Sequence, residues 1–280
     1  MRVHHLNCGT MRPRGGSLLD GRAGLLRRVE LVCHCLLLET SAGLVLVDTG
    51  MGAQAARRPH EWLGRQFVAL TSPLLADDET ALSQVQRLGF GAQDVRHVVL
   101  THLDLDHAGG LVDFPDATVH VYGTELRALQ APRDRIERTR YRSVQFAHGP
   151  RWRPYQVGGE PWFDFDAVRE LDGLPAEILL VPLAGHTRGH AGVAVDTGDG
   201  WLLHAGDSYF FHREINPGAP YCPPGLAAFE AMVQTERCAR LDNHRRLRAL
   251  VREHGTQVEV FSAHDAVEYR RLTSGAPLET

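Results

Sequence analysis

The 280-residue sequence contains no lysine, and all 30 of its basic residues are arginine. Mechanisms that depend on a lysine nucleophile or a lysine base are therefore excluded. The chain carries 34 acidic residues and a net charge of −4, and its arginines form no basic stripe of the kind that neutralises nucleic-acid phosphates. We therefore expect no nucleic-acid partner.

The sequence also lacks long hydrophobic runs and a disulfide pattern. Its longest apolar stretches, such as residues 35–38, are far shorter than the roughly 18 to 20 residues that cross a bilayer. The first residues carry no secretory signal, and five cysteines, an odd number, do not indicate a disulfide framework. We therefore expect no membrane partner, a cytoplasmic location, and cysteines that serve mainly as core thiols, Cys33 and Cys35 included.

The order of β-prone and helical segments predicts one α/β domain over residues 1–280. Hairpins are predicted at 31–38 with 44–48 and at 192–197 with 201–205, and further strands at 97–100, 117–122, 178–181 and 258–261. Helices are predicted at 77–88 and 124–130, and two more within 225–253. Two segments without a sustained period, at about 53–76 and 133–173, are interpreted as insertions over the core, the second of them lid-like.

Four side chains of metal-ligand type occur within six residues directly after the strand 97–100: His102, Asp104, Asp106 and His107. In an extended chain the first three project to one side, because they stand two residues apart. Imidazole nitrogens and carboxylate oxygens are the ligands of zinc, manganese and iron sites. A single such residue is more often a solvated polar group or a helix cap, but the cluster favours a metal site.

Further candidate ligands end later strands. His186 and His190 stand four apart between glycines after the strand 178–181, Asp207 follows 201–205, and His264 follows 258–261. Taken alone, the histidine pair fits a functional and a structural role equally well, whereas Asp207 or His264 would more often be a cap or a satisfied polar group. Because open sheets place their sites at the ends of strands, the shared position favours a common site.

Together these residues resemble the metallo-β-lactamase superfamily, whose pattern is an HxHxDH motif, then a histidine, a bridging aspartate and a final histidine. The resemblance implies a four-layer αββα sandwich and two divalent metal ions, zinc in the first place with manganese or iron as alternatives. One ion would be held by His102, Asp104 and His186, the other by Asp106, His107 and His264, and Asp207 would bridge them. Asp48 and His190 would lie behind the ligands and orient them.

The motif departs from the family pattern at Asp104, which stands where HxHxDH has its second histidine. An anionic oxygen makes the site harder and moves its preference from zinc toward manganese or iron. A related glutamate occurs in the flavodiiron branch of the superfamily, so an iron-dependent oxidoreductase is one alternative function. A metal-stabilised binding module without turnover is another. Metal analysis with a redox assay tests the first alternative, and a broad substrate panel tests the second.

The aspartate at position 207 and the ending Phe261-Ser262-Ala263-His264-Asp265 resemble the lactonase branch, near the acyl-homoserine lactonases. This resemblance implies hydrolysis of an ester-like bond, a lactone or an ester above all, in a small-molecule substrate by a hydroxide between the metals. Asp106 would pass a proton to the leaving alkoxide, and Tyr209 would donate to the carbonyl oxygen. Packing is the alternative role for Tyr209, since it opens the aromatic triplet 209–211. No motif specifies the substrate or the oligomeric state.

Overall fold

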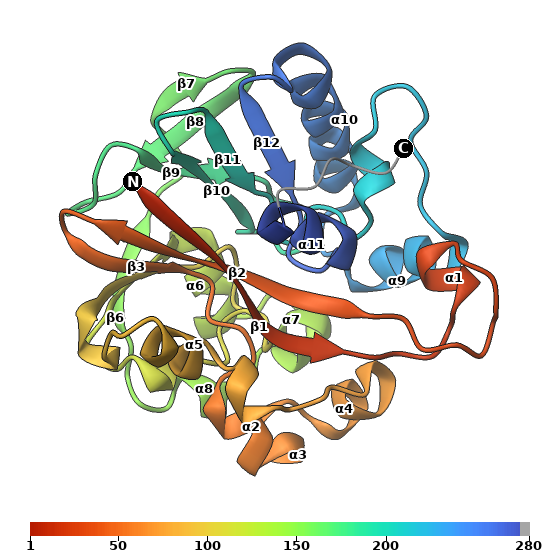
Figure 1. Cartoon of the computed structure of the whole chain (residues 1–280), viewed down its shortest axis with the longest axis horizontal. Coiled ribbons are helices and arrows are strands. Elements are labelled where there is room, and N and C mark those ends of the chain that lie inside the picture. The colour runs from red at the N-terminus through yellow and green to blue at the C-terminus, as the bar shows by residue number, and fades with distance from the viewer. Residues whose placement is uncertain (275–280) are drawn as a thin grey trace.

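Two six-stranded sheets packed face to face form the centre of the fold in the computed structural model, which describes residues 1–274 (Figure 1). The first sheet has the order β1 (Arg2–Met11), β2 (Leu31–Thr40), β3 (Gly43–Val47), β4 (Val95–Val99), β5 (Thr118–Tyr122) and β6 (Arg151–Tyr155). The second has the order β12 (Val258–Phe261), β11 (Trp201–His204), β10 (Ala191–Asp196), β9 (Ile178–Pro182), β8 (Phe165–Glu170) and β7 (Glu160–Trp162). Both sheets are mixed: β3 to β6 run parallel, as do β11 and β12, and the other neighbours are antiparallel.

Helices cover the outer faces of both sheets. Those in the first half of the chain are α1 (Ser17–Asp20), α2 (Ala53–Arg57), α3 (Pro59–Trp62), α4 (Arg65–Thr71), α5 (Ala81–Arg87), α6 (Gly123–Gln130), α7 (Arg135–Arg140) and α8 (Ser143–Phe146). The second half holds α9 (Pro224–Val233), α10 (Arg237–His254) and α11 (Ala266–Ser274). Short 3₁₀ turns are η1 (Asp77–Glu79), η2 (Ala92–Asp94), η3 (Leu111–Asp113) and η4 (His212–Ile215). No helix in residues 1–274 is long and apolar enough to cross a membrane.

Three apolar layers, one between the sheets and one on the outer face of each, explain why the central strands have nearly continuous hydrophobic sequences. In β2, Leu36 and Leu38 point into the core between the sheets, while Leu37 faces the helices on the other side. Helices α5 and α6 pack on the outer face of the first sheet, and α10 packs on that of the second. Because both faces of the central strands are buried, apolar residues occupy both alternating sets of positions. The predicted four-layer αββα sandwich is confirmed.

The predicted hairpins correspond to β2–β3 and β10–β11, and the predicted strand 258–261 matches β12. The helix predicted over 77–88 is broken into η1 and α5. Thr80 divides the two because its hydroxyl caps α5, accepting a hydrogen bond from Ser83 N at 3.2 Å. Helix α6 spans Gly123–Gln130 and so agrees closely with the predicted range 124–130.

The two segments interpreted as insertions contain more regular structure than their sequences indicate. Residues 53–76 hold the short helices α2, α3 and α4, two of which begin after glycines of positive φ. Residues 133–173 were interpreted as a lid-like insertion. In the structure this segment forms α7 and α8 and then supplies the sheet strands β6, β7 and β8. Strands β6 and β7 lie at sheet edges and expose most of their side chains, so arginine and proline replace the apolar alternation of inner strands, while β8 lies between β7 and β9.

Candidate metal centre

Four loops that follow strands bring the candidate ligands to one place. His102 to His107 follow β4, His186 lies in the connection from β9 to β10, Asp207 follows β11 and His264 follows β12. Seven residues predicted from the sequence as ligands lie in or beside two overlapping clusters: His102, Asp104, Asp106, His107, His186, Asp207 and His264. Nearly all of them are buried, and Asp104 is the most exposed, with 15% of its side chain accessible.

The first cluster joins His102, Asp104, His186 and Asp207. The Oδ2 atom of Asp104 lies 3.3 Å from His102 Nε2 and 3.0 Å from His186 Nε2. The Oδ2 atom of Asp207 lies 3.7 Å from His102 Nε2 and 3.3 Å from His186 Nε2. Four ligands held about 2.0–2.1 Å from a tetrahedral zinc ion stand about 3.3 Å apart, so these spacings suit such an ion.

The second cluster joins His107, His264 and the other oxygen of Asp207. The two Nε2 atoms lie 3.2 Å apart, and Asp207 Oδ1 is 3.2 Å from His107 Nε2 and 3.1 Å from His264 Nε2. Asp106 Oδ2 lies 3.7 Å from His264 Nε2. The carboxylate of Asp207 therefore stands between the clusters, with one oxygen facing each of them.

Buried polar atoms without a hydrogen-bond partner indicate whether this arrangement suits metal ions. His102 Nε2 and Asp207 Oδ1 are buried and have no hydrogen-bond partner among the described residues. Burying such atoms without a partner costs about 1–3 kcal/mol each, and buried polar groups are normally paired. Imidazole nitrogens and carboxylate oxygens that converge in this way are a donor set for divalent cations. The residues present therefore fit the metal ions that the sequence implies.

The far nitrogens of the histidine rings are fixed by partners behind the clusters. His107 Nδ1 donates to Asp48 Oδ2 at 2.8 Å, and His264 Nδ1 donates to the Val32 carbonyl oxygen at 2.7 Å. These bonds leave each Nε2 free to face Asp207. Asp48 adopts a φ of 57°, and its Oδ1 accepts from Thr101 N at 2.8 Å. Asp48 thereby connects the end of β3 to the loop that carries the HLDLDH motif.

His190 lies behind Asp207. Its Nδ1 donates to the Leu183 carbonyl oxygen at 3.0 Å, and its Nε2 accepts from the backbone N–H of Asp207 at 2.9 Å. It therefore holds the backbone of Asp207 and does not belong to either cluster.

The charges of the clusters influence one another strongly. Burial alone would raise the pKa of Asp207, but His264, His107 and His186 together hold it well below its usual value. Burial opposes a charged His107, yet Asp207 and Asp48 raise the pKa of this ring well above its ordinary value. The neighbouring carboxylates therefore favour a proton on His107, and metal binding at this ring competes with that proton.

Arg140 is a residue of the site that sequence analysis did not identify. Its Nε and Nη2 atoms donate to the two oxygens of Asp104, each at 2.6 Å, while Nη2 also contacts His186 Nε2 and Nη1 donates to the Val233 carbonyl oxygen. Burial would raise the pKa of Asp104, but Arg140 holds it well below its usual range. The extra negative charge that Asp104 brings to the motif is thus compensated by a buried guanidinium from α7.

Glu125 on α6 is a second residue that the sequence did not single out. Its Oε1 accepts hydrogen bonds from Leu103 N at 3.1 Å and from the Tyr141 hydroxyl at 3.0 Å. Its Oε2 accepts from the Thr187 hydroxyl at 2.7 Å and from Gly189 N at 3.1 Å. This fully buried carboxyl group therefore ties the loop after β4 to the loop after β9, and so sets the spacing of His102 and His186.

Cys33 is buried, as expected of a core thiol, but it also lies within 4.8 Å of ligand atoms of Asp106 and His264. Burial and the neighbouring Asp106 raise the pKa of this thiol well above its ordinary value. Cys35 stands on the same face of β2 and packs into the core beneath the helices. All five cysteines are free.

Tyr209 occupies a different position from the one its predicted catalytic role requires. The side chain is fully buried among residues of β11, β12 and α10, and its hydroxyl donates to Glu268 Oε1 at 2.9 Å. A donor to the substrate carbonyl needs a free hydrogen at the site, which this hydroxyl does not offer. The next residue, Phe210, is the aromatic side chain at the clusters, where its ring stacks on His264 with centroids 5.3 Å apart.

Replacing Tyr209 by phenylalanine is expected to lower stability and to leave hydrolytic activity within about twofold. The variant leaves the Oε1 atom of the buried Glu268 carboxyl group without its hydrogen-bond donor, which costs about 1–3 kcal/mol. Urea unfolding and steady-state kinetics on the same preparation measure both quantities. A hundredfold loss of kcat with unchanged stability would restore the catalytic role for Tyr209.

Comparison with known proteins identifies the class to which this fold and site belong. The family model of the metallo-beta-lactamase superfamily matches residues 28–247, so the chain belongs to this superfamily. Proteins of this fold bind divalent metals, and the chain is a metallo-hydrolase of the superfamily. It is 43% identical over 273 residues to the probable metallo-hydrolase Rv2300c of Mycobacterium tuberculosis, which covers 96% of this chain and 82% of that protein.

Lactonases are also among its relatives. An N-acyl homoserine lactonase of a Bacillus species is 24% identical over 169 residues, which is 60% of each chain. The solved structure of AiiA from B. thuringiensis, with N-decanoyl-L-homoserine at its active site, superposes with a TM-score of 0.71 at 20% identity over 99% of this chain and 96% of that one. This likeness establishes the shared fold.

Proposed function

We propose that this protein is a two-metal hydrolase that cleaves an ester-like bond, a lactone or an ester, in a small molecule. The observation that carries the proposal is the position of Asp207, whose Oδ2 faces His102 and His186 while its Oδ1 faces His107 and His264. A carboxylate shared in this way is a natural bridge between two cations.

Two sets of residues would hold the two ions. His102, Asp104, His186 and Asp207 would hold the first, and His107, His264, Asp106 and Asp207 the second. Divalent ions bound there supply Lewis acidity for a substrate carbonyl and lower the pKa of water. Zinc is our first choice, with manganese or iron favoured by the hard ligand Asp104.

The protein's own groups would orient the substrate and move protons. Asp106 is nearly buried, and burial raises the pKa of its carboxyl group despite the nearby His107 and His264. A carboxyl group of this kind can take a proton during attack and give it to the leaving alkoxide. Phe210 stacks on His264 and presents an apolar wall that excludes water from the reacting bond.

The choice of an ester-like bond is supported by the lactonases among the relatives and by the aspartate between the clusters. An iron-dependent oxidoreductase remains the alternative suggested by Asp104. Arg140 weakens that alternative, because it neutralises the carboxylate that sets this chain apart from the common motif.

The decisive experiment strips the full-length protein with a chelator and reloads it separately with zinc, manganese and iron. Each form is assayed with lactones, carboxylic esters, thioesters and phosphodiesters, while metal content is measured by mass spectrometry. We expect two equivalents of metal and turnover of lactones or esters. Two bound metals without hydrolysis of any substrate would favour a binding module, and oxygen consumption restricted to the iron form would favour the oxidoreductase.

A further inference from the structure

An arginine-lined cavity of about 630 Å³ opens beside the second cluster. Its wall is built by three separate parts of the chain: the connection from β1 to β2, the loop after β11 with η4, and the start of α11. The buried side chains of His264 and Phe210 also line it. The volume lies in the range of about 300–1,000 Å³ that small-molecule sites occupy. A substrate whose reacting bond lies at the clusters therefore has room here for the rest of its structure.

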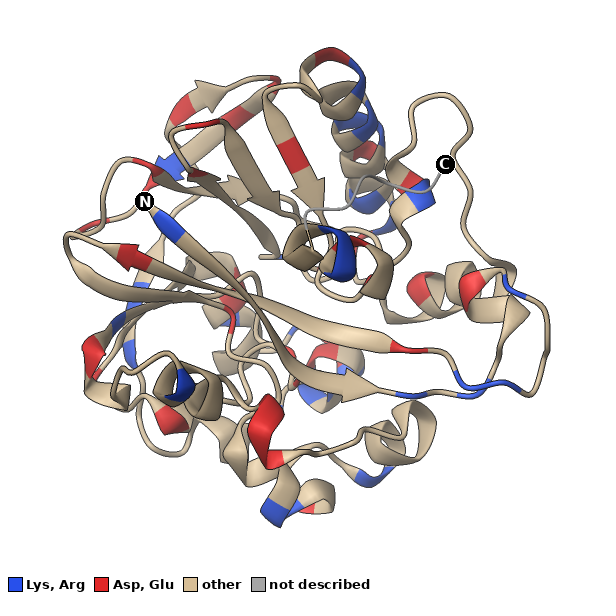
Figure 2. Cartoon of the chain, in the orientation of Figure 1, with Lys and Arg blue, Asp and Glu red and all other residues tan. Residues whose placement is uncertain are grey.

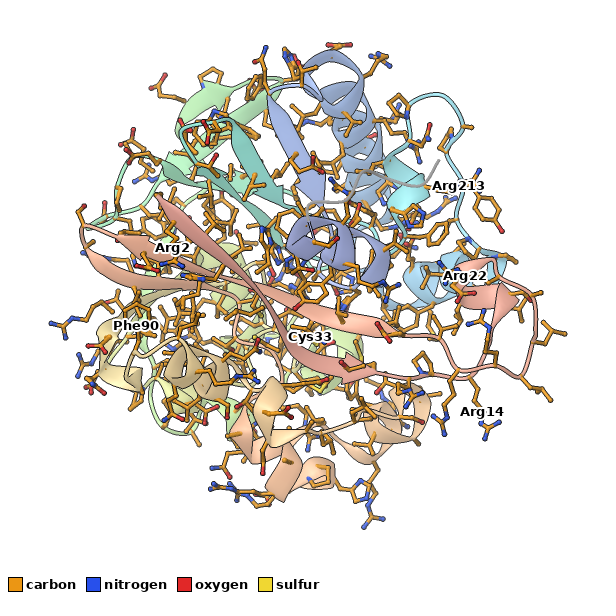
Figure 3. All side chains as sticks on the ribbon, viewed as in Figure 1. Arg2, Arg14, Arg22, Cys33, Phe90 and Arg213 are labelled. Carbon is orange, nitrogen blue, oxygen red and sulfur yellow. The ribbon has the colours of Figure 1, made fainter. Side chains whose placement is uncertain are left out.

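The cavity carries more positive than negative charge, although the chain as a whole is acidic. Five arginines line it against three carboxyl groups, and the arginines are Arg22, Arg27, Arg28, Arg213 and Arg270. Figure 2 shows basic positions recurring along the connection between β1 and β2, at the right of the view. Figure 3 shows Arg22 and Arg213 on this same side of the molecule.

All three carboxyl groups of the cavity already have partners. Arg27 Nη2 lies 2.7 Å from Asp20 Oδ1, Arg270 Nη1 lies 2.8 Å from Glu30 Oε1, and His212 Nδ1 lies 2.8 Å from Asp265 Oδ2. Two of the five guanidinium groups are thus neutralised by carboxylates of the cavity wall, and the remaining three are not.

Arg22, Arg28 and Arg213 have no carboxylate partner within residues 1–274. Arg28 donates to the Arg12 carbonyl oxygen at 2.7 Å, and the guanidinium of Arg213 lies 5.1 Å from the centre of the Tyr221 ring. These contacts leave the positive charges of the two exposed side chains without a counter-charge. A guanidinium presents several N–H donors in the planar arrangement that matches a carboxylate or a phosphate.

We infer that the cavity binds an anionic end of the substrate, a carboxylate or a phosphate, while the ester-like bond lies at the clusters. This inference rests on the proposed hydrolytic function and specifies its substrate class. His264 and Phe210 connect the two sites, because both line the cavity and their rings stack beside the clusters. The substrate is therefore an acid-bearing ester or lactone, and a purely apolar acyl chain does not match this wall.

The kinetic test compares p-nitrophenyl esters of equal chain length that end in a carboxylate, a phosphate or a methyl group. With the full-length, metal-loaded protein at low ionic strength, we expect kcat/KM at least tenfold higher for one of the anionic esters. The preference should shrink as salt is added, because salt shortens the Debye length to about 8–10 Å near physiological ionic strength and so weakens the attraction between exposed charges. Which anionic ester is preferred distinguishes a carboxylate from a phosphate. Equal rates for all three esters would overturn the inference.

Matched variants locate the effect. The double substitution Arg28→Gln and Arg213→Gln should lower the ratio of kcat/KM for the anionic and methyl esters at least fivefold. Arg14→Gln removes one positive charge from the same connection but lies outside the cavity wall, so it should leave the ratio unchanged (Figure 3). An unchanged ratio in the double variant, or an equal fall in the Arg14 variant, would contradict the assignment.

A binding measurement separates this inference from the proposed function. Glutaramate and ethyl phosphate carry an anionic group but no carboxylic ester, and calorimetry measures their binding to the wild-type protein and to the Arg28/Arg213 double variant. Binding of either probe that the double variant loses supports the cavity even if no ester is hydrolysed. If esters are hydrolysed and neither probe distinguishes the two proteins, the hydrolase proposal stands and the anionic subsite is overturned.

Discussion

Asp207→Ala is expected to release both metal ions and to abolish hydrolysis, because one carboxylate faces both clusters. The loss of activity should exceed about 100-fold, since even residues behind metal ligands contribute about 10–100-fold. His107→Ala should remove the second ion and activity with it. Metal content by mass spectrometry and kcat/KM on the best ester of the panel measure both effects.

The fold should survive these substitutions, since neither residue belongs to the three apolar layers. Circular dichroism of the variants checks this point. Asp116→Ala serves as the matched control: it also removes an aspartate, but one that is exposed and paired only with Arg151 at the surface. Two equivalents of metal retained by Asp207→Ala would rule out its role as the shared ligand.

The second large effect concerns Asp104 and Arg140. Asp104→Asn is expected to destabilise the metal-free protein by about 3–5 kcal/mol, because it leaves a buried guanidinium without a counter-charge. Arg140→Met should cost a similar amount by leaving the carboxylate unpaired. The double variant removes both charges together, so its cost should be much smaller than the sum of the single costs.

Urea unfolding in the presence of a chelator measures this cycle without any contribution from metal. The exposed pair Arg151–Asp116, with nitrogen and oxygen 2.9 Å apart, provides a control cycle in which the coupling should stay below about 1 kcal/mol. Additive effects at Asp104 and Arg140 would mean that the guanidinium does not compensate the motif's extra charge.

The sequence predicts much of this fold because the central strands are buried on both faces. Their apolar runs, such as residues 31–38, are recognisable in the sequence, and the turn residues between them indicate hairpins. The edge strands β6 and β7 were missed because solvent-exposed edges lose the apolar alternation, and β8 was missed with its partner β7. Strand β6 takes its structure from pairing with β5, from which α6, α7 and α8 separate it along the chain, so no local pattern records it.

The candidate ligands were predictable because metal-type side chains recur at the ends of strands. The roles of Arg140 and Glu125 could not be predicted, because each resembles an ordinary helix residue. Their partners Asp104 and Gly189 lie 36 and 64 residues away in the chain. Tyr209 illustrates the opposite error. It stands two residues after Asp207, but the chain turns there, and its side chain points into the core beside Glu268 while Phe210 faces the site.

A crystal structure with metals located by anomalous scattering tests the central claim most directly. We predict two peaks about 3.5–4 Å apart on either side of the Asp207 carboxylate, with Asp104 bound to the first ion while Arg140 contacts its other oxygen. A single peak, or two peaks with Asp104 turned away to Arg140 alone, would contradict the two-metal centre proposed for this protein.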